Sequence, residues 1–158
     1  MANSPEGTGQ EAVRIAEAVR DAMLKGDHAT RAMGIRIESV GPGRCTAAMV
    51  VREDMLNGHG VCHGGFIATL ADSAFAFACN AYNELTLASG FDVNLFAPAR
   101  LGDLLTASAE EVSKSGRTGV YDVLVTNQRD ERIAALRGRS YTMKGKPVVE
   151  GAPMGAAR

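Results

Sequence analysis

The middle of the chain carries a carboxylate in a segment whose other residues favour burial. Asp72 is the only acidic or basic side chain between Gly64 and Ala81, in a stretch rich in Ala and Phe. Burying an unpaired carboxylate costs free energy, so either a partner such as Ser73 or Asn80 satisfies it or it opens onto a pocket. In a pocket it could act as a general base or as a nucleophile. Because perturbed carboxylates concentrate at functional sites, we favour the pocket.

A second chemical feature lies where this segment begins. His63-Gly64-Gly65 leads into it with little side-chain bulk, which leaves backbone N–H groups accessible at the positive end of a helix. Such an end can hold an anion or polarise a carbonyl oxygen as an oxyanion hole. The alternative is that the two glycines only permit a tight turn from loop to helix.

The two features are too far apart to act together in one chain. Gly64 and Asp72 are eight residues apart in the sequence, which is about 12 Å along a helix. A group that attacks a carbonyl polarised at Gly64 must approach to about 3.5 Å. If both residues are catalytic, each site therefore takes Asp72 from one subunit and Gly64 from another, as two antiparallel helices at a two-fold axis would allow. This hypothesis predicts an obligate dimer with two equivalent sites.

Other reactive side chains form weaker patterns. His59, Cys62 and His63 are possible metal ligands, but Cys45 and Cys79 are distant in the sequence and no ligand set of zinc-site spacing results, so we predict no metal. Cys62 and His63 are adjacent, and neighbouring side chains diverge too much for a nucleophile and its base. Cys79 is interpreted as a small core residue.

Asn57 lies in the loop before the apolar segment, where it could donate its amide to a carbonyl or orient a water, or simply form a turn. The sequence contains no phosphate-binding loop, no dinucleotide fingerprint and no GxSxG nucleophile motif.

The composition excludes several classes of protein. The chain has 158 residues, of which 46% are hydrophobic and 22% charged, with a net charge of −1. This is typical of one globular domain and argues against a nucleic-acid-binding protein, which is normally basic. Asp72 interrupts the only long apolar stretch, so no membrane association is expected. The absence of a signal-peptide pattern and of a disulfide framework predicts a cytoplasmic protein.

The charge is unevenly distributed along the chain. Residues 1–111 contain 8 basic and 14 acidic side chains, whereas residues 112–158 contain 9 basic and 4 acidic ones. Scattered surface charge would produce some asymmetry, but the basic C-terminal third could also face an anion.

The pattern of apolar residues predicts one α+β domain. A helix is expected over 10–24, two strands that form a hairpin over 33–37 and 45–51, a loop over 53–63 and a buried helix over 64–82. Four strands follow, over 86–97, 103–113, 118–128 and 131–143, with a tight turn at 113–117. This order favours an antiparallel sheet curved around the central helix, with the first helix at one edge. Residues 1–9 and 146–158 are expected to be flexible tails that flank a domain over 10–145.

Residues 55–80, MLNGHGVCHGGFIATLADSAFAFACN, closely resemble the hotdog-fold acyl-CoA thioesterases of the phenylacetate-degradation type. The resemblance continues through GFDVNLFAP at 90–98, GRTGVYD at 116–122 and LRGRS at 136–140, and covers roughly residues 30–144. It implies a long helix wrapped by a curved antiparallel sheet, and a homotetramer built from dimers. It also implies hydrolysis of an acyl-CoA thioester to CoA and a carboxylic acid, with no cofactor beyond the CoA of the substrate.

The resemblance assigns roles to the candidate residues. Asp72 would activate water or attack the thioester, and the Gly64 N–H of the other subunit would polarise the carbonyl. Asn57 and His63 would line that helix end, and Ser73 would position the water.

For CoA binding, the resemblance implicates Asn94 and the turn formed by Lys114, Ser115, Gly116, Arg117 and Thr118, with Arg117 near a phosphate. Arg100, Arg137 and Arg139 are weaker candidates, because Arg137 and Arg139 could instead project from a strand into solvent.

The acyl group is not readable from the sequence. Phe66, Phe75 and Phe91 could line a pocket for an aromatic group, such as phenylacetyl, or for a medium-length chain, but core packing explains them equally well. Two other functions stay open. One is hydration or dehydration of acyl thioesters, which in related folds uses a His and a carboxylate from different segments. The other is binding of acyl-CoA without turnover.

Overall fold

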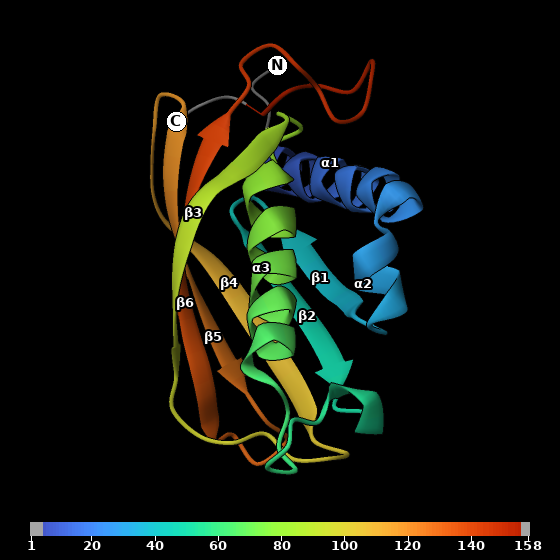
Figure 1. Cartoon of the computed structure of the whole chain (residues 1–158). Helices are drawn as coiled ribbons and strands as arrows, with labels where there is room; N and C mark the ends of the chain where they lie inside the picture. Colours follow the sequence, from blue (N-terminus) through green and yellow to red (C-terminus); the bar gives the residue numbers. More distant parts are fainter. Residues whose placement is uncertain (1–4, 156–158) are drawn as a thin grey trace.

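The computed structural model describes residues 5–155 and contains one antiparallel sheet, one long helix against its concave face, and two helices beside it (Figure 1). In chain order the elements are α1 (Pro5–Gly26), α2 (His28–Ala32), β1 (Arg36–Gly41), β2 (Arg44–Val50), a 3-10 turn (Glu53–Met55), α3 (Gly64–Asn80), β3 (Thr86–Leu95), β4 (Leu104–Ser115), β5 (Thr118–Thr126) and β6 (Arg132–Thr142).

The sheet confirms the predicted architecture. Its strands lie in the order β1-β2-β4-β5-β6-β3, and every neighbouring pair is antiparallel. The sheet curves around α3, while α1 packs against the edge strand β1 (Figure 1). The other edge strand, β3, is paired only with β6 in the described part of the chain. The chain therefore presents one edge beside a helix and one edge with unpaired backbone groups.

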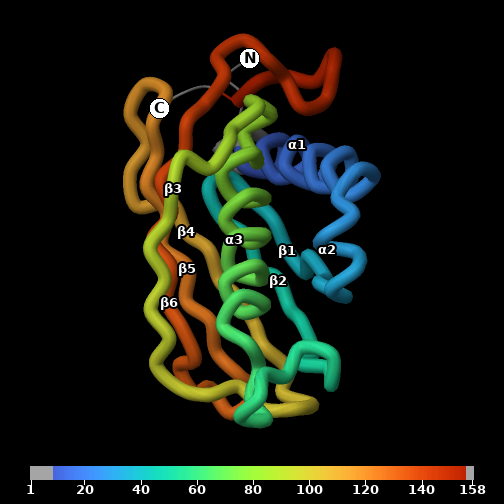
Figure 2. The backbone as a smooth tube through the Cα atoms, viewed as in Figure 1, coloured from blue at the N-terminus to red at the C-terminus, as the bar shows by residue number. Residues whose placement is uncertain are grey.

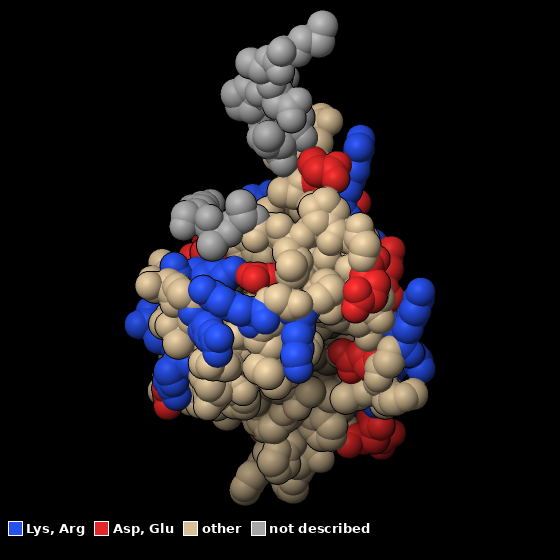
Figure 3. Space-filling model, turned by 90° about the horizontal axis from the view of Figure 1, so that it is seen from above, with Lys and Arg blue, Asp and Glu red and all other residues tan. Residues whose placement is uncertain are grey.

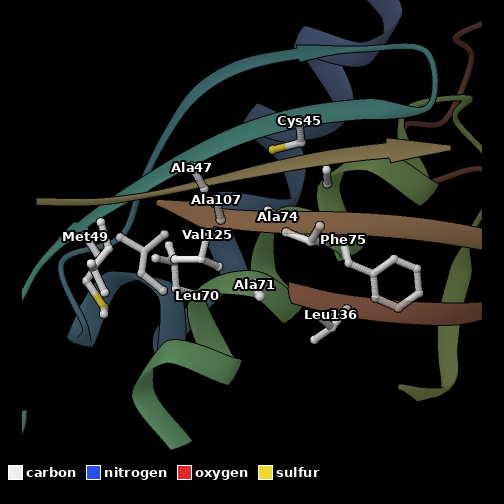
Figure 4. Packing of buried hydrophobic residues seen from close by; sticks show 14 of the residues in the cluster. Cys45, Ala47, Met49, Leu70, Ala71, Ala74, Phe75, Ala107, Val125 and Leu136 are labelled. Atoms are coloured by element: carbon white, nitrogen blue, oxygen red, sulfur yellow. The ribbon is translucent and has the colours of Figure 1, made fainter. Parts of the chain in front are cut away.

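Small residues allow α3 to lie close to the sheet. Ala71 and Ala74 are fully buried, and they face inward-pointing side chains such as Ala107 and Leu136 of the strands (Figure 4). Large side chains fill the remaining space: Phe75 packs at 5.4 Å between ring centroids from Tyr121. Phe75 is therefore a core residue, which is one of the two roles that the sequence left open for it.

The N-terminal region differs from the prediction in two ways. Helix α1 begins at Pro5 rather than at residue 10, so the predicted flexible tail is wrong for residues 5–9, and residues 1–4 lie outside the described chain. Proline is favoured in a first helical turn because its missing N–H has no partner there in any case. The short helix α2 lies before the predicted first strand, where no element was expected, and β1 begins at Arg36 rather than at residue 33. Asp27 caps α2 by accepting a hydrogen bond from the backbone N–H of Thr30.

The C-terminal segment is held by one buried side chain rather than being a free tail. Asn83 is fully buried and has a φ of 58°; its amide oxygen accepts hydrogen bonds from the N–H groups of Val148 and Val149. Its amide nitrogen donates to the carbonyls of Val149 and Ala152. The segment consequently crosses over the end of α3 that follows Asn80 (Figure 2). The predicted flexible tail is wrong for residues 146–155, and residues 156–158 lie outside the described chain.

Candidate active site

One side of α3 is left incompletely covered. Along the helix, Gly65 is exposed, and Thr69, Asp72 and Ala76 are half-buried. Steps of three and four residues place them on one face. The sheet lies behind the helix and α1 and α2 lie to one side, whereas no other element crosses its front in Figure 1. The prediction of a helix buried on all sides is therefore wrong for the single chain, and the uncovered face is the one that carries Asp72.

Asp72 is only partly accessible and is incompletely hydrogen-bonded. Its Oδ1 atom is buried and has no hydrogen-bond partner among the described residues. Burial raises the pKa of the Asp72 carboxyl above its ordinary value, because the charged form loses hydration. Neither Ser73 nor Asn80 satisfies this oxygen, although both were considered as partners. A carboxylate in this state is a stronger base than a solvated one.

Ser73, the next residue, turns toward α2 instead. Its Oγ lies 3.2 Å from Oγ1 of Thr30, and the Thr30 hydroxyl donates to Oδ2 of Asp27 at 2.7 Å. Thr30 is 1% exposed, so the three side chains form a largely buried chain of hydrogen bonds from α2 to α3. Sequence analysis missed Asp27 and Thr30. The only local signal is the spacing of a capping Asp three residues before the residue whose N–H it binds.

At the beginning of α3, the Gly65 backbone N–H is hydrogen-bonded within residues 5–155 and the Gly64 backbone N–H is not. His63 is the N-cap residue, and its Nδ1 accepts a hydrogen bond from the Gly65 N–H at 3.2 Å. Its backbone carbonyl accepts from the Phe66 N–H at 3.0 Å. The Gly64 N–H has no acceptor within the described chain, as expected for a first helical residue. This arrangement makes Gly64, rather than Gly65, the donor that can reach a bound carbonyl oxygen.

Gly64 lies in a pocket that also contains Asn57. The pocket has a volume of about 310 Å³ and includes Leu95, Phe96 and Pro98 along one wall. A Cβ atom on Gly64 would lie 2.6 Å from the Leu95 Cδ1 atom, so glycine fits here without displacing that side chain. The side-chain Oδ1 of Asn57 accepts hydrogen bonds from the loop N–H groups of His59 and Val61, so its side-chain Nδ2 is the group that remains to donate.

The predicted CoA turn forms, but its residues are not equivalent. Gly116 has a φ of 60° and closes the hairpin between β4 and β5. The Lys114 ammonium is engaged with the Glu84 carboxylate at 3.5 Å and lies 4.1 Å from the centre of the Tyr82 ring. Arg117 is exposed, donates only to the Tyr141 hydroxyl at 3.0 Å, and makes no ion pair in the described chain.

The end of the molecule that bears this hairpin is basic. Figure 3 looks down on this end and shows Lys and Arg side chains gathered there with few acidic ones between them. The exposed Arg117, Lys144 and Lys146 lack ion-pair partners within residues 5–155. Ser115 and Thr118 serve the turn itself, since the Thr118 hydroxyl donates to the Ser115 carbonyl.

Asn94 is separated from the other candidates. On β3, Leu95 and Val93 pair with the inward-facing Ala134 and Leu136, so Asn94 points to the outer face of the sheet. It borders a groove of about 550 Å³ whose other walls include Asp92, Glu110 and Asp122. The structure therefore does not bring Asn94 to the side of the sheet on which Asp72 lies.

Two of the C-terminal arginines, Arg137 and Arg139, are paired with carboxylates on the same outer face. Arg137 binds Asp122 through two hydrogen bonds of 2.7 and 2.6 Å, and Arg139 lies 2.6 Å from Asp92. Both project into solvent, as the alternation of the strand predicted. Ion pairs thus engage about half of the basic side chains in this part of the described chain, and Arg117, Lys144 and Lys146 at the hairpin end are among those without one.

The structure gives no support to thiol or metal chemistry. Burial raises the pKa of Cys62 to about 11 and that of Cys45 to about 12. Among residues 5–155 no three His, Cys, Asp or Glu side chains gather as a metal site would require, and His59, Cys62 and His63 form no such group. No helix in the same part of the chain is long and apolar enough to span a membrane.

Comparison with known proteins places this chain in one family. Residues 59–134 match the family model described as the thioesterase superfamily. Over 124 residues the chain is 40% identical to acyl-coenzyme A thioesterase PaaI of Escherichia coli (strain K12), covering 78% of this chain and 89% of that protein. The chain belongs to the thioesterase superfamily. The matched region includes both Gly64 and Asp72.

Solved structures agree with this membership and with the hotdog fold of the thioesterase superfamily. The E. coli PaaI protein of the phenylacetic acid degradation operon has a TM-score of 0.84 and 38% identity, covering 85% of this chain and 98% of that chain. A Streptococcus mutans protein bound to acetyl CoA has a TM-score of 0.68 and 25% identity, covering 71% of this chain and 90% of its own.

Proposed function

We propose that this thioesterase-superfamily protein hydrolyses acyl-CoA thioesters to CoA and a carboxylic acid. The observation that carries the proposal is the Asp72 carboxylate, buried at Oδ1 without a partner on the one uncovered face of α3. Its relatives named as acyl-CoA thioesterases and its structural likeness to PaaI support the same reaction. The acyl group is proposed to be an aromatic one such as phenylacetyl, or a medium-length chain.

The site is proposed to require a second copy of the chain. Strand β3 offers an unpaired edge, and its inward-facing Phe91, Val93 and Leu95 are 40%, 37% and 53% exposed. The adjoining face of α3 carries small residues, which let a second helix approach closely. Pairing two β3 edges about a two-fold axis would cover both surfaces at once and place the α3 helices antiparallel. The interface formed by the two β3 edges is then isologous, and each dimer contains two sites.

In the proposed dimer the catalytic groups come from different subunits. The Gly64 N–H of one subunit donates to the thioester carbonyl oxygen and stabilises the negative charge that develops there. Asp72 of the other subunit either removes a proton from the attacking water or attacks the carbonyl carbon itself. Asn57 donates its free amide near the same helix end. His63 fixes that end by binding the Gly65 N–H, which leaves the Gly64 N–H directed to substrate.

The CoA nucleotide is proposed to lie at the hairpin end of the molecule. Arg117 supplies the uncompensated charge for a phosphate, while the Lys114–Thr118 turn shapes the surface around it. Lys114 is already paired with Glu84, so we assign it a supporting role. We further propose a cytoplasmic homotetramer, in which two dimers meet through another surface.

Two sets of measurements test the proposal, the first on activity and oligomeric state and the second on the shared site. The first is thiol release from a panel of aromatic and aliphatic acyl-CoAs, for which the wild-type protein should turn over at least one substrate group. Binding of CoA without thiol release from any of them would instead favour a binding protein. Sedimentation at assay concentrations should show at least a dimer, and a fully active monomer would contradict the shared site.

The second measurement asks whether the site is shared between subunits. Gly64→Pro removes the N–H at a helix position that accepts proline, and the extended His63 before it is compatible with this change. Gly64→Ala is the matched control, since it adds the same Cβ near Leu95 but keeps the N–H. Asp72→Asn and Gly64→Pro are each expected to be inactive alone.

When these two inactive variants are mixed and exchange subunits, each heterodimer contains one intact site. Random exchange makes half of the dimers heterodimers, so about a quarter of the wild-type rate should return. No recovery, with subunit exchange verified, would show that the two residues do not act across the interface.

A further inference from the structure

We infer that Asp27 and Thr30 are positioning residues that hold Ser73 in the orientation needed at the active site. This inference rests on the proposed hydrolysis and concerns how α2 acts on it. The observation is the hydrogen-bonded chain from Asp27 through Thr30 to Ser73, whose last member is the neighbour of Asp72.

The direction of the hydrogen bonds follows from counting protons. A hydroxyl group has one proton to donate. The Thr30 hydroxyl donates its proton to Oδ2 of Asp27 at 2.7 Å, so in the 3.2 Å contact with Ser73 it can only accept. Ser73 is therefore the donor, and its single proton points toward Thr30. The Ser73 oxygen then meets any further partner only as an acceptor.

An acceptor beside a carboxylate suits a hydrolytic water. A water bound between Asp72 and Ser73 would donate one proton to each, which leaves an oxygen lone pair free to face the carbonyl carbon. If Ser73 could rotate and donate instead, it would occupy that lone pair or hydrogen-bond to Asp72. The relay, which is the hydrogen-bonded chain of Asp27, Thr30 and Ser73, excludes this second orientation of the Ser73 hydroxyl before substrate binds.

Burial and capping keep the relay rigid. Thr30 is 1% exposed, and Oδ1 of Asp27 also accepts the Thr30 backbone N–H at 3.0 Å, so the carboxylate is held at both oxygens. The direction of the hydrogen bonds is thus set by the cap of a five-residue helix, and the Thr30–Ser73 hydroxyl pair links that helix to α3. A purely structural contact would not require the proton to point in a particular direction.

The donor-to-acceptor direction of the hydrogen bonds in the relay can be reversed without removing the cap of α2. In Asp27→Asn the amide oxygen can still accept the Thr30 N–H, which places the amide nitrogen beside the Thr30 hydroxyl as a donor. The Thr30 proton must then turn toward Ser73, and the Ser73 proton is released into the site. Thr30→Val removes the acceptor, whereas Thr30→Ser keeps it and serves as the rescue variant.

The test is steady-state thiol release with kcat and KM determined separately, together with thermal unfolding of each variant. Thr30→Val and Asp27→Asn are each expected to lower kcat about five- to tenfold, the effect of one neutral hydrogen bond, with KM unchanged. Thr30→Ser should stay within about twofold of wild type. Combining Thr30→Val with Ser73→Ala should be no slower than Ser73→Ala alone, because Thr30 acts through Ser73.

The outcomes separate this inference from the proposed function. If the wild-type protein hydrolyses acyl-CoA while Asp27→Asn and Thr30→Val keep full kcat, or lower only the melting temperature, the relay is wrong and the function stands. Additive losses in the double variant would likewise overturn a role exerted through Ser73. If the wild-type protein releases no thiol, both the function and the relay fall together.

Discussion

Asp72 and Asp103 are both withdrawn from solvent at least in part, and their surroundings are opposite. Asp103 is 4% exposed and follows the turn before β4. It accepts hydrogen bonds from the Arg100 N–H and the Gln128 amide, each at 2.8 Å, and lies 3.4 Å from the Arg129 guanidinium. Burial acts to raise the pKa of Asp103, but these donors outweigh it, and the pKa is lowered.

Asp72 receives none of this support. The hydroxyl groups nearest to it on α3 are engaged elsewhere, since Thr69 donates to the Gly65 carbonyl and Ser73 contacts Thr30. The helix backbone N–H groups around it are already used within the helix. Burial therefore acts unopposed and raises its pKa. The difference between Asp103 and Asp72 shows that the fold can provide hydrogen-bond donors to a buried carboxylate where turns supply them. The partner that Asp72 lacks must come from outside the chain, as water, substrate or a second subunit.

The largest expected contrast is in catalytic rate. Asp72→Asn should lower kcat/KM for acyl-CoA hydrolysis by about a thousandfold, because it removes the base or nucleophile, which corresponds to about 4 kcal/mol. Asp103→Asn is a matched change at a buried carboxylate and should leave kcat/KM of the folded protein within about twofold. Thiol release under identical conditions measures both. An Asp72→Asn variant with full activity would remove the distinction between the two carboxylates.

The next contrast is in stability, where we expect substitution of Asp103, rather than of Asp72, to have the harmful effect. Asp103→Asn is expected to lower the free energy of unfolding by about 2 kcal/mol, because donors that bind a carboxylate lose their charged acceptor. The lowered pKa in the folded protein means that this stabilisation is present above the ordinary pKa near 3.8 and is lost as the pH falls through the folded value.

Urea unfolding at pH 7 and near pH 3 measures this difference for Asp103→Asn, which should be large at pH 7 and smaller near pH 3. Arg129→Gln is the control, since it removes only the half-exposed partner of Asp103 and should change stability much less. A variant as stable as wild type at pH 7 would mean that the hydrogen bonds around Asp103 contribute little.

Patterns local to the sequence predicted most of the architecture. The alternation of β4 to β6 and the Ala-rich run of α3 reflect periods of two and of three to four residues, which any sequence displays directly. The carboxylate at Asp72 and the glycine at Gly64 were also identifiable, because each breaks the composition of its surroundings. Both keep the positions on α3 that the sequence implied.

Contacts between distant residues were not predictable in the same way. Thr30 meets Ser73 across 43 positions, and Asn83 binds Val149 across 66. The sequence around a Thr or an Asn does not indicate which distant residue it will contact. The relay and the ordered C-terminal segment could therefore be identified only from the structure. The engagement of Lys114 by Glu84 is of the same kind, and it changed which basic residue of the hairpin remains available.

The smallest expected contrast is a gain in stability at the active site. The folded protein raises the pKa of Asp72, so ionising this group favours the unfolded chain. The stability associated with its protonated form is fully present below the ordinary pKa of 3.8 and is lost as the pH rises through the folded value. Asp72→Asn, which cannot ionise, should therefore be more stable than wild type at pH 7, by about 1 kcal/mol.

The same urea series that measures Asp103→Asn tests this last effect with the sign reversed. The advantage of Asp72→Asn should be present at pH 7, shrink as the pH falls toward the ordinary pKa of 3.8, and vanish in stronger acid, where the wild-type carboxyl is protonated in both states. If the stability advantage of Asp72→Asn over wild type shrinks as protein concentration rises, the partner of Asp72 is a second subunit, because a partner's helix N-terminus stabilises the carboxylate only in the dimer. A loss of stability at pH 7, equal to that of Asp103→Asn, would instead mean that Asp72 is satisfied like Asp103, and the argument that it awaits an outside partner would fail.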